Sequence, residues 1–133
     1  MVNSKVDDKM DQPTFISSLV FASTISSYKY AFSVFNGIAV LNFTAVVGTS
    51  IASGSIKTIL TSSGYIPSSY RPTNAVGFLA SLYNDSNDRW DFLTAYVNSN
   101  GAIYIRPTAT INVGDTIRGS ISWTYDSDAW ETG

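Results

Sequence analysis

Residues 28–47, YKYAFSVFNGIAVLNFTAVV, decide the fold class of this chain. Two runs rich in aromatic and β-branched residues, which favour strands, flank the dipeptide Asn36-Gly37. Both residues of the dipeptide tolerate a positive φ, so they suit the two-residue turn of a β-hairpin. The stretch therefore predicts two antiparallel strands, 28–35 and 38–47, joined by a tight turn.

Further strands are predicted on both sides of this hairpin, because short runs of β-forming residues alternate with turn residues and no amphipathic helix follows residue 15. The predicted strands are 15–22, 28–35, 38–47, 56–61, 75–83, 91–98, 102–106 and 116–124. Residues 98–101 predict a second hairpin, and residues 113–115 a further turn. The fold class is all-β: about eight strands in an antiparallel β-sandwich or small barrel, jelly-roll-like in arrangement.

Alternation along each strand predicts which side chains face the core. The core-facing sets are Val76, Phe78, Ala80 and Leu82; Ile103 and Ile105; and Ile117, Gly119, Ile121 and Trp123. Strands 28–35 and 38–47 differ, because both of their faces carry aromatic or β-branched residues. We expect one face of this hairpin in the core and the other against another subunit.

The chain has the length of one domain, 133 residues. Residues 14–125 are expected to form the β-rich domain, and residues 126–133 an acidic C-terminal tail. Within residues 1–13, Val2, Val6 and Met10 recur every four residues before Pro13, which prevents a helix from continuing. This short helical or linker segment is either the remnant of a stalk or an unstructured terminus.

The composition narrows the chemistry. Neither cysteine nor histidine occurs, which excludes disulfides, thiolate nucleophiles, histidine-based triads and most zinc sites. The net charge of −2 and the pI near 4.7 argue against binding to nucleic acid. The sequence therefore predicts no catalytic residue, no metal and no cofactor.

Charge is scarce in the middle of the chain. Between Gln12 and Asn84 the only ionic side chains are Lys29, Lys57 and Arg71. Such a surface fits a neighbouring subunit or a neutral ligand; an acidic secreted domain with ordinary polar strands is the alternative interpretation.

Neither a membrane span nor a signal peptide is predicted. Residues 30–56 carry no charge, but their asparagines, serines and β-branched residues argue against membrane insertion. The first residues contain no apolar segment typical of a signal peptide. A role outside the cell would then need another route, such as assembly into a virion that is released by lysis.

The densest polar stretch, residues 84–91, is predicted to be an exposed loop between two strands. An indole ring packs on the apolar face of a sugar, while carboxylate and guanidinium groups hydrogen-bond its hydroxyls. The candidate saccharide-binding residues here are Asn87, Asp88, Arg89, Trp90 and Asp91. The alternatives are that Trp90 folds back onto the sheet or contacts another subunit.

The strand that follows has an aromatic second face, which is either an intersubunit surface or a binding platform; the area of such a face favours the intersubunit surface. Trp90, Phe92, Thr94 and Tyr96 share one face of it, and an aromatic second face rarely stays uncovered.

Asp85, Asp88 and Asp91 recur every three residues, so a calcium site and a pair of glycosidase carboxylates are two further interpretations. Their spacing does not match a calcium-binding EF-hand loop. A glycoside hydrolase needs two carboxyl groups across a cleft, whereas these are predicted to lie on one exposed tip. Neither a calcium site nor a hydrolase is expected.

Residues 63–72, SGYIPSSYRP, predict an irregular crossing segment stiffened by two prolines. Tyr70 and Arg71 are further candidate saccharide-binding residues. Alternatively, these two residues hold the segment against the sheet.

This segment, with AIYI at 102–105 and VGDTIRGSISW at 113–123, resembles the C-terminal head domain of tail-tip or baseplate receptor-binding proteins of long-tailed phages that infect Gram-positive bacteria. The resemblance covers residues 63–124, and its motifs are structural rather than catalytic. It implies a homotrimer of β-sandwich heads at the tail tip or baseplate of a virion, in contact with other phage tail proteins. It also implies binding to host cell-wall or cell-surface polysaccharide through residues that vary between phages.

The expected function is therefore non-enzymatic host adhesion. Two alternatives stay open: a purely structural trimerisation module of a baseplate or fibre, and a tail enzyme that cleaves glycans. No contact with nucleic acid is expected.

Overall fold

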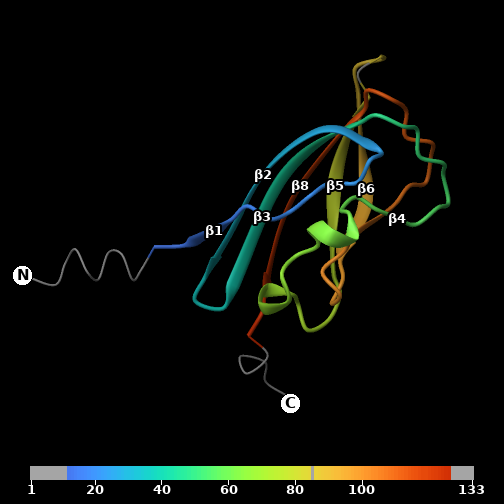
Figure 1. Cartoon of the computed structure of the whole chain (residues 1–133). Helices are drawn as coiled ribbons and strands as arrows, with labels where there is room; N and C mark the ends of the chain where they lie inside the picture. The colour runs from blue at the N-terminus through green and yellow to red at the C-terminus, as the bar shows by residue number, and fades with distance from the viewer. Residues whose placement is uncertain (1–11, 85, 127–133) are drawn as a thin grey trace, which may run out of the picture.

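The computed structural model describes residues 12–84 and 86–126, which form one curled antiparallel sheet of eight strands (Figure 1). The strands are β1 (Thr14–Ile16), β2 (Ile25–Phe35), β3 (Ile38–Val47), β4 (Lys57–Thr58), β5 (Val76–Asn84), β6 (Arg89–Val97), β7 (Ile103–Arg106) and β8 (Thr116–Thr124). Two short 3-10 helices, η1 (Ser62–Gly64) and η2 (Ser68–Tyr70), interrupt them. The all-β prediction is confirmed. No helix in the described ranges is long and apolar enough to cross a membrane.

The strand order across the sheet is β1-β2-β3-β8-β5-β6-β7-β4. β2 and β3 form one hairpin, β5 to β7 form a meander, and β8 lies between these two groups. A single curled sheet corresponds to the small-barrel form of the prediction rather than to two separate layers. The predicted N-terminal helical or linker segment and the acidic tail fall almost entirely outside the described residues.

The turns follow the predicted chemistry. Asn36 and Gly37 adopt φ values of 51° and 84°, and they join the directly paired residues Phe35 and Ile38. Such positive φ values at both positions match the right-handed twist of the two strands. In the second hairpin, the backbone N–H of Asn98 donates to the carbonyl of Ala102 at 2.8 Å. The predicted turn at 113–115 is confirmed by Gly114, whose φ is 93°.

The prediction of one strand over 15–22 was wrong. β1 ends at Ile16, and the chain then leaves β2 and crosses to the opposite edge of the sheet. There the backbone N–H of Ala22 donates to the carbonyl of Ile59, and that of Thr61 donates to the carbonyl of Val20, both at 2.8 Å. The segment is apolar because it closes the open side of the curl, and it changes pairing partners on the way.

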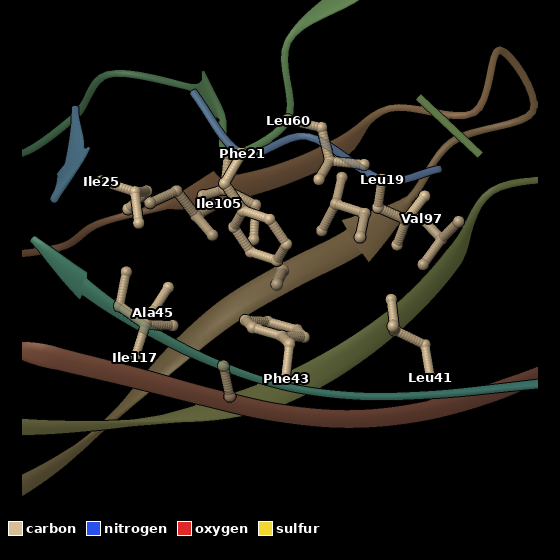
Figure 2. Packing of buried hydrophobic residues seen from close by; sticks show 14 of the residues in the cluster. Leu19, Phe21, Ile25, Leu41, Phe43, Ala45, Leu60, Val97, Ile105 and Ile117 are labelled. Atoms are coloured by element: carbon tan, nitrogen blue, oxygen red, sulfur yellow. The ribbon is translucent and has the colours of Figure 1, made fainter. Parts of the chain in front are cut away.

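The core fills the inside of the curl (Figure 2). Its largest fully buried side chains include Phe32, Leu41, Ile51, Ile59, Leu60, Ile66, Ile103, Ile105, Ile111 and Ile117. They come from both halves of the sheet and from the crossing segments, so no single hairpin could bury them alone. Each such side chain contributes about 1.5–3 kcal/mol through removal from water. The alternation predicted for the strands ending in Leu82, Ile105 and Trp123 is confirmed.

The outer face of the β2–β3 hairpin is only partly apolar. Near the turn, Phe35, Ile38 and Val40 are 42%, 48% and 37% exposed, and Phe15 on the adjacent β1 is 70% exposed. We call these four residues the hairpin-end patch. Further along, the outer face carries the small or polar side chains of Ala31, Asn42 and Thr44. The prediction of two apolar faces therefore holds at the turn end of the hairpin, but not in its middle.

Candidate functional site

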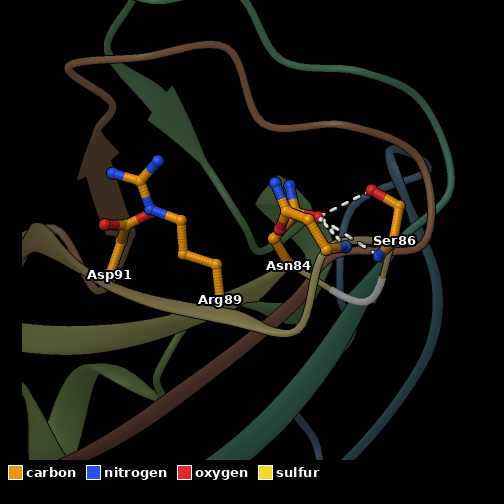
Figure 3. Close-up of polar contacts among 5 residues, drawn as sticks. Asn84, Ser86, Arg89 and Asp91 are labelled. Atoms are coloured by element: carbon orange, nitrogen blue, oxygen red, sulfur yellow. Dashed lines mark hydrogen bonds and ion pairs between the residues drawn. The ribbon is translucent and has the colours of Figure 1, made fainter.

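The candidate site lies where β5 turns into β6. Direct pairing extends to Asn84 and Arg89, so Trp90 and Asp91 are strand residues rather than members of a long loop. Asn84 stabilises the short turn, because its side-chain oxygen accepts hydrogen bonds from the backbone N–H groups of Ser86 at 3.2 Å and Asn87 at 3.3 Å (Figure 3). The predicted loop over 84–91 was thus too long: its polar residues suggested a loop, but pairing continues through them.

Strand geometry separates the predicted site residues. Successive side chains in a strand point to opposite faces. Trp90 pairs with Tyr83 on the outer face, whereas Asp91 pairs with Leu82, whose face is the core side of β5. Arg89 shares the face of Asp91, and its Nε lies 3.4 Å from the Asp91 carboxylate (Figure 3). Arg89 and Asp91 therefore do not flank the Trp90 ring. The sequence interpretation had placed all three side chains around one sugar.

The outer face at the tip carries an aromatic platform. Trp90 is 58% exposed and Phe92 is 77% exposed. The ring of Tyr83 lies 4.8 Å from that of Trp90, and the Arg118 guanidinium lies 5.4 Å from the centre of the Trp90 ring. We call Tyr83, Trp90, Phe92 and Arg118 the Trp90 platform. The predicted aromatic second face of this strand is confirmed, and Trp90 does not fold into the core.

A polar edge borders this platform. The Tyr83 hydroxyl donates a hydrogen bond to the Asp88 carboxylate at 2.7 Å. Asp88 adopts a φ of 51°, which a turn residue of this type tolerates. Of the candidate residues from the sequence, Trp90 and Asp88 are therefore brought to one side of the hairpin, through Tyr83. Asn87 lies exposed in the turn between the two faces.

Arg89 and Asp91 belong to a second, smaller site. They line a hollow of about 200 Å³ with Leu82 and the segment 107–109. Their side chains are 68% and 46% exposed, so the pair is solvated and contributes little to stability. A carboxylate and a guanidinium at the rim of such a hollow can still orient a polar ligand by hydrogen bonds.

Tyr70 and Arg71 lie at the other end of the β5–β6 hairpin, beside the turn that precedes β7. Arg71 Nε donates to the carbonyl of Ile66 at 2.7 Å, and the backbone N–H of Ile66 donates to the carbonyl of Gly101 at 3.0 Å. The indole N–H of Trp123 donates to the carbonyl of Tyr70 at 2.7 Å. These contacts hold the crossing segment against the sheet, which was the alternative interpretation of both residues.

Two carboxylates of the hairpin, Asp88 and Asp91, lie on different sides of it. Asp88 is bonded to Tyr83 on the outer side, while Asp91 lies beside Arg89 on the other side. Among residues 12–84 and 86–126, no group of three or more acidic, histidine or cysteine side chains is placed to hold a metal ion. The chemistry that this region offers is stacking on aromatic rings and hydrogen bonding.

Arg118 is the residue that sequence reasoning missed. It follows Ile117 in β8, and alternation alone places its side chain on the outer face. The signal was therefore present, but the pairing of β8 with β5 that brings Arg118 beside Trp90 has no local signature in the sequence.

Among known proteins, the chain has matches in structure but none in sequence. No protein-family model and no curated protein matches the sequence. Among solved structures, the chain is similar to the crystal structure of the head domain of phage bIL170, reported with the receptor-binding domains of lactococcal phages, with a TM-score of 0.64 and 16% sequence identity. The match covers 85% of this chain and 98% of that chain. The chain therefore has the fold of a phage head domain, in agreement with the resemblance seen in residues 63–124.

Proposed function

We propose that this chain is the host-recognition head of a phage tail protein and that it binds a bacterial surface saccharide on the Trp90 platform. The observation that carries this proposal is the exposed indole of Trp90, held beside Tyr83 and Arg118 on the paired part of a hairpin. The likeness in fold to the bIL170 head domain supports the tail location and the adhesive role.

The platform suits a sugar ring. The indole presents an apolar surface to the C–H face of a pyranose, and the polar groups around it supply directed hydrogen bonds. The Tyr83 hydroxyl and the Asp88 carboxylate are already bonded to each other, so their geometry is fixed before a ligand arrives. A preorganised group loses less conformational entropy on binding. A shallow site of this kind binds one saccharide weakly, at about millimolar to high micromolar Kd.

The head acts as a homotrimer in this proposal. The hairpin-end patch of Phe15, Phe35, Ile38 and Val40 supports this, because adjacent exposed apolar side chains commonly mark an interface. In a trimer with closed symmetry, the patch of every subunit is buried against a neighbouring subunit. Three weak sites in one head, and several heads in one tail, raise the effective affinity through local concentration. Contacts with other tail or baseplate proteins hold the head in the virion.

A purely structural trimerisation module is the second candidate, and the hairpin-end patch favours it equally. A glycan-cleaving enzyme gains no support from the geometry, since Asp88 and Asp91 lie on different faces of the hairpin and do not face one another across a cleft.

The test is a titration of the protein with oligosaccharides released from host cell walls, followed by calorimetry, with the mass measured by light scattering. Saturable binding by a trimer supports the proposal. A trimer that binds no host saccharide favours the structural module, and release of reducing ends from the polysaccharide would favour the enzyme.

A further inference from the structure

A groove of about 430 Å³ lies on the outer face of β2, β3 and β8. Its lining residues are Lys29, Tyr30, Ala31, Asn42, Phe43, Thr44, Arg118 and Gly119. The outer surface is recessed at this point because the cross-strand neighbours Ala31 and Asn42 have short side chains. The two long side chains, Lys29 and Arg118, belong to the outer strands of the three, β2 and β8.

These two cations flank Thr44 in one row of the sheet. Lys29 pairs directly with Thr44, and Thr44 pairs directly with Arg118. Because neighbouring strands lie about 4.8 Å apart, the Cα atoms of Lys29 and Arg118 are separated by about 10 Å. All three side chains share the outer face. The Arg118 guanidinium lies near the Trp90 ring, on the side of β8 away from β3, so the positive charge extends along this row from Lys29 toward the indole.

Among the described residues, no acidic side chain pairs with the two cations of the groove. In the part of the chain that the structure describes, Arg89 forms an ion pair with Asp91. Neither Lys29 nor Arg118 forms an ion pair there. None of the groove-lining residues is acidic. Two uncompensated cations at this separation raise the potential within the groove, although the chain as a whole is acidic.

Arg118 connects the groove to the Trp90 platform. Its guanidinium lies 5.4 Å from the centre of the Trp90 ring, and its side chain also lines the groove. A ligand stacked on Trp90 therefore lies next to the groove. A substituent on that ligand can reach Lys29 and Thr44 across β3.

We propose that Lys29, Thr44 and Arg118 form a subsite for an oxyanion, a carboxylate or a phosphate group, carried by the saccharide that binds at Trp90. This inference rests on the proposed function for the identity of the carrier. Arginine binds either group through paired N–H donors, lysine adds a mobile point charge, and the threonine hydroxyl donates one hydrogen bond. The ligand is thus an acidic glycan rather than a neutral one.

The first experiment maps the subsite without a host glycan. Sodium glucuronate, inorganic phosphate and neutral glucose are titrated into isotope-labelled protein at constant ionic strength, and amide chemical shifts are followed by NMR. The amides of Lys29, Thr44 and Arg118 are expected to shift with either or both anions, and to stay in place with glucose. The anion that binds more tightly identifies the group. No shift of these amides with either anion overturns the subsite.

A matched pair of lysine variants separates the subsite from a general effect of charge. Lys29→Gln removes a cation from the groove, whereas Lys57→Gln removes an exposed strand cation that does not line it. We expect Lys29→Gln to weaken anion binding about fivefold or more and Lys57→Gln to leave it unchanged. An equal loss in the two variants would mean nonspecific attraction and would overturn the subsite.

Trp90→Ala makes the two proposals distinguishable. If host saccharide binds through Trp90 but Lys29→Gln changes nothing, the subsite is wrong and the proposed function stands. If the anions bind through Lys29 but no saccharide binds, the subsite stands and the saccharide proposal fails.

Discussion

The Arg118 guanidinium lies 5.4 Å from the centre of the Trp90 ring, although the two residues are far apart in the sequence. β8 pairs with β5 over residues 116–118, and β5 pairs with β6 through Tyr83 and Trp90. The cation therefore reaches the indole across three adjacent strands. An interaction of this kind contributes about 0.5–1 kcal/mol at an exposed position, and it favours the observed orientation of both side chains.

Trp90→Ala should weaken saccharide binding by about 1–3 kcal/mol, as truncation of a central aromatic anchor does. The folded protein should persist, because the Trp90 side chain is 58% exposed. Val113→Ala is the control, since Val113 is an apolar residue that is 65% exposed and belongs neither to the Trp90 platform nor to the hairpin-end patch. Titration by NMR and thermal melting check both variants. Unchanged binding together with a large loss of stability would show that Trp90 serves the fold.

Trp123→Phe should lower the free energy of unfolding by about 1–3 kcal/mol, because a buried hydrogen bond is lost and its acceptor stays unsatisfied. The indole N–H of Trp123 donates to the Tyr70 carbonyl at 2.7 Å, and Trp123 is 5% exposed. The same substitution at the exposed Trp90 should change stability by less than about 0.5 kcal/mol. Urea denaturation measures both values. Equal effects would contradict the anchoring role of Trp123.

Gly101→Ala should destabilise the protein more than Gly114→Ala. Both glycines have positive φ, 90° and 93°, so alanine carries a similar backbone penalty of about 1–2 kcal/mol at each. At Gly101 a Cβ would also lie 2.5 Å from Arg71 Nε and 2.6 Å from the Ile66 carbonyl, whereas at Gly114 nothing lies within 4 Å. Melting temperatures of the two variants give the comparison. A smaller effect at Gly101 would mean that the crossing segment moves aside easily.

Phe35→Ser combined with Ile38→Ser should convert the proposed trimer to a monomer at micromolar concentration. These two residues pair directly with each other within the hairpin-end patch, and a polar side chain there would be desolvated in an interface. Leu79→Ser is the control, because Leu79 is 66% exposed on β5, away from this patch. Light scattering reports the mass. If only the Leu79 variant dissociates, the trimer interface lies on the β5–β6 face and not at the hairpin-end patch.

Asp88→Asn and Asp91→Asn should leave host polysaccharide intact to the same extent as the unaltered protein. The two carboxylates lie on different faces, so neither can assist the other across a glycosidic bond. A reducing-end assay on isolated cell-wall polysaccharide tests this expectation. Cleavage that disappears in either variant would assign a hydrolytic role to that residue.

Local patterns were sufficient to predict most of the fold. The Asn36-Gly37 turn and the alternation in 75–83 and 116–124 depend on neighbouring residues alone, and the structure confirms them. The split of 15–22 could not be predicted in this way. It follows from closure of the sheet against Ile59 and Leu60, which lie about forty residues further along the chain.

The candidate site was less predictable because nearness in sequence does not mean nearness in space. Arg89, Trp90 and Asp91 are consecutive, yet strand pairing turns the middle side chain away from the other two. The shared face of Trp90, Phe92, Thr94 and Tyr96 already contained this information, since it placed Trp90 within a strand. The same alternation, extended to the residues before and after Trp90, places Arg89 and Asp91 on the face opposite to the indole.

The two chain ends of the described domain meet at one pole. Gln12, Thr14 and Tyr125 border the same hollow of about 420 Å³, and the backbone N–H of Tyr125 donates to the carbonyl of Gly37 at 3.0 Å. The turn that presents Trp90 lies at the opposite pole (Figure 1). A domain whose two ends lie close together can replace another domain in a longer protein without a change to the rest of that protein's fold. Under the proposed function, recombination at that junction would transfer recognition specificity in a single genetic step.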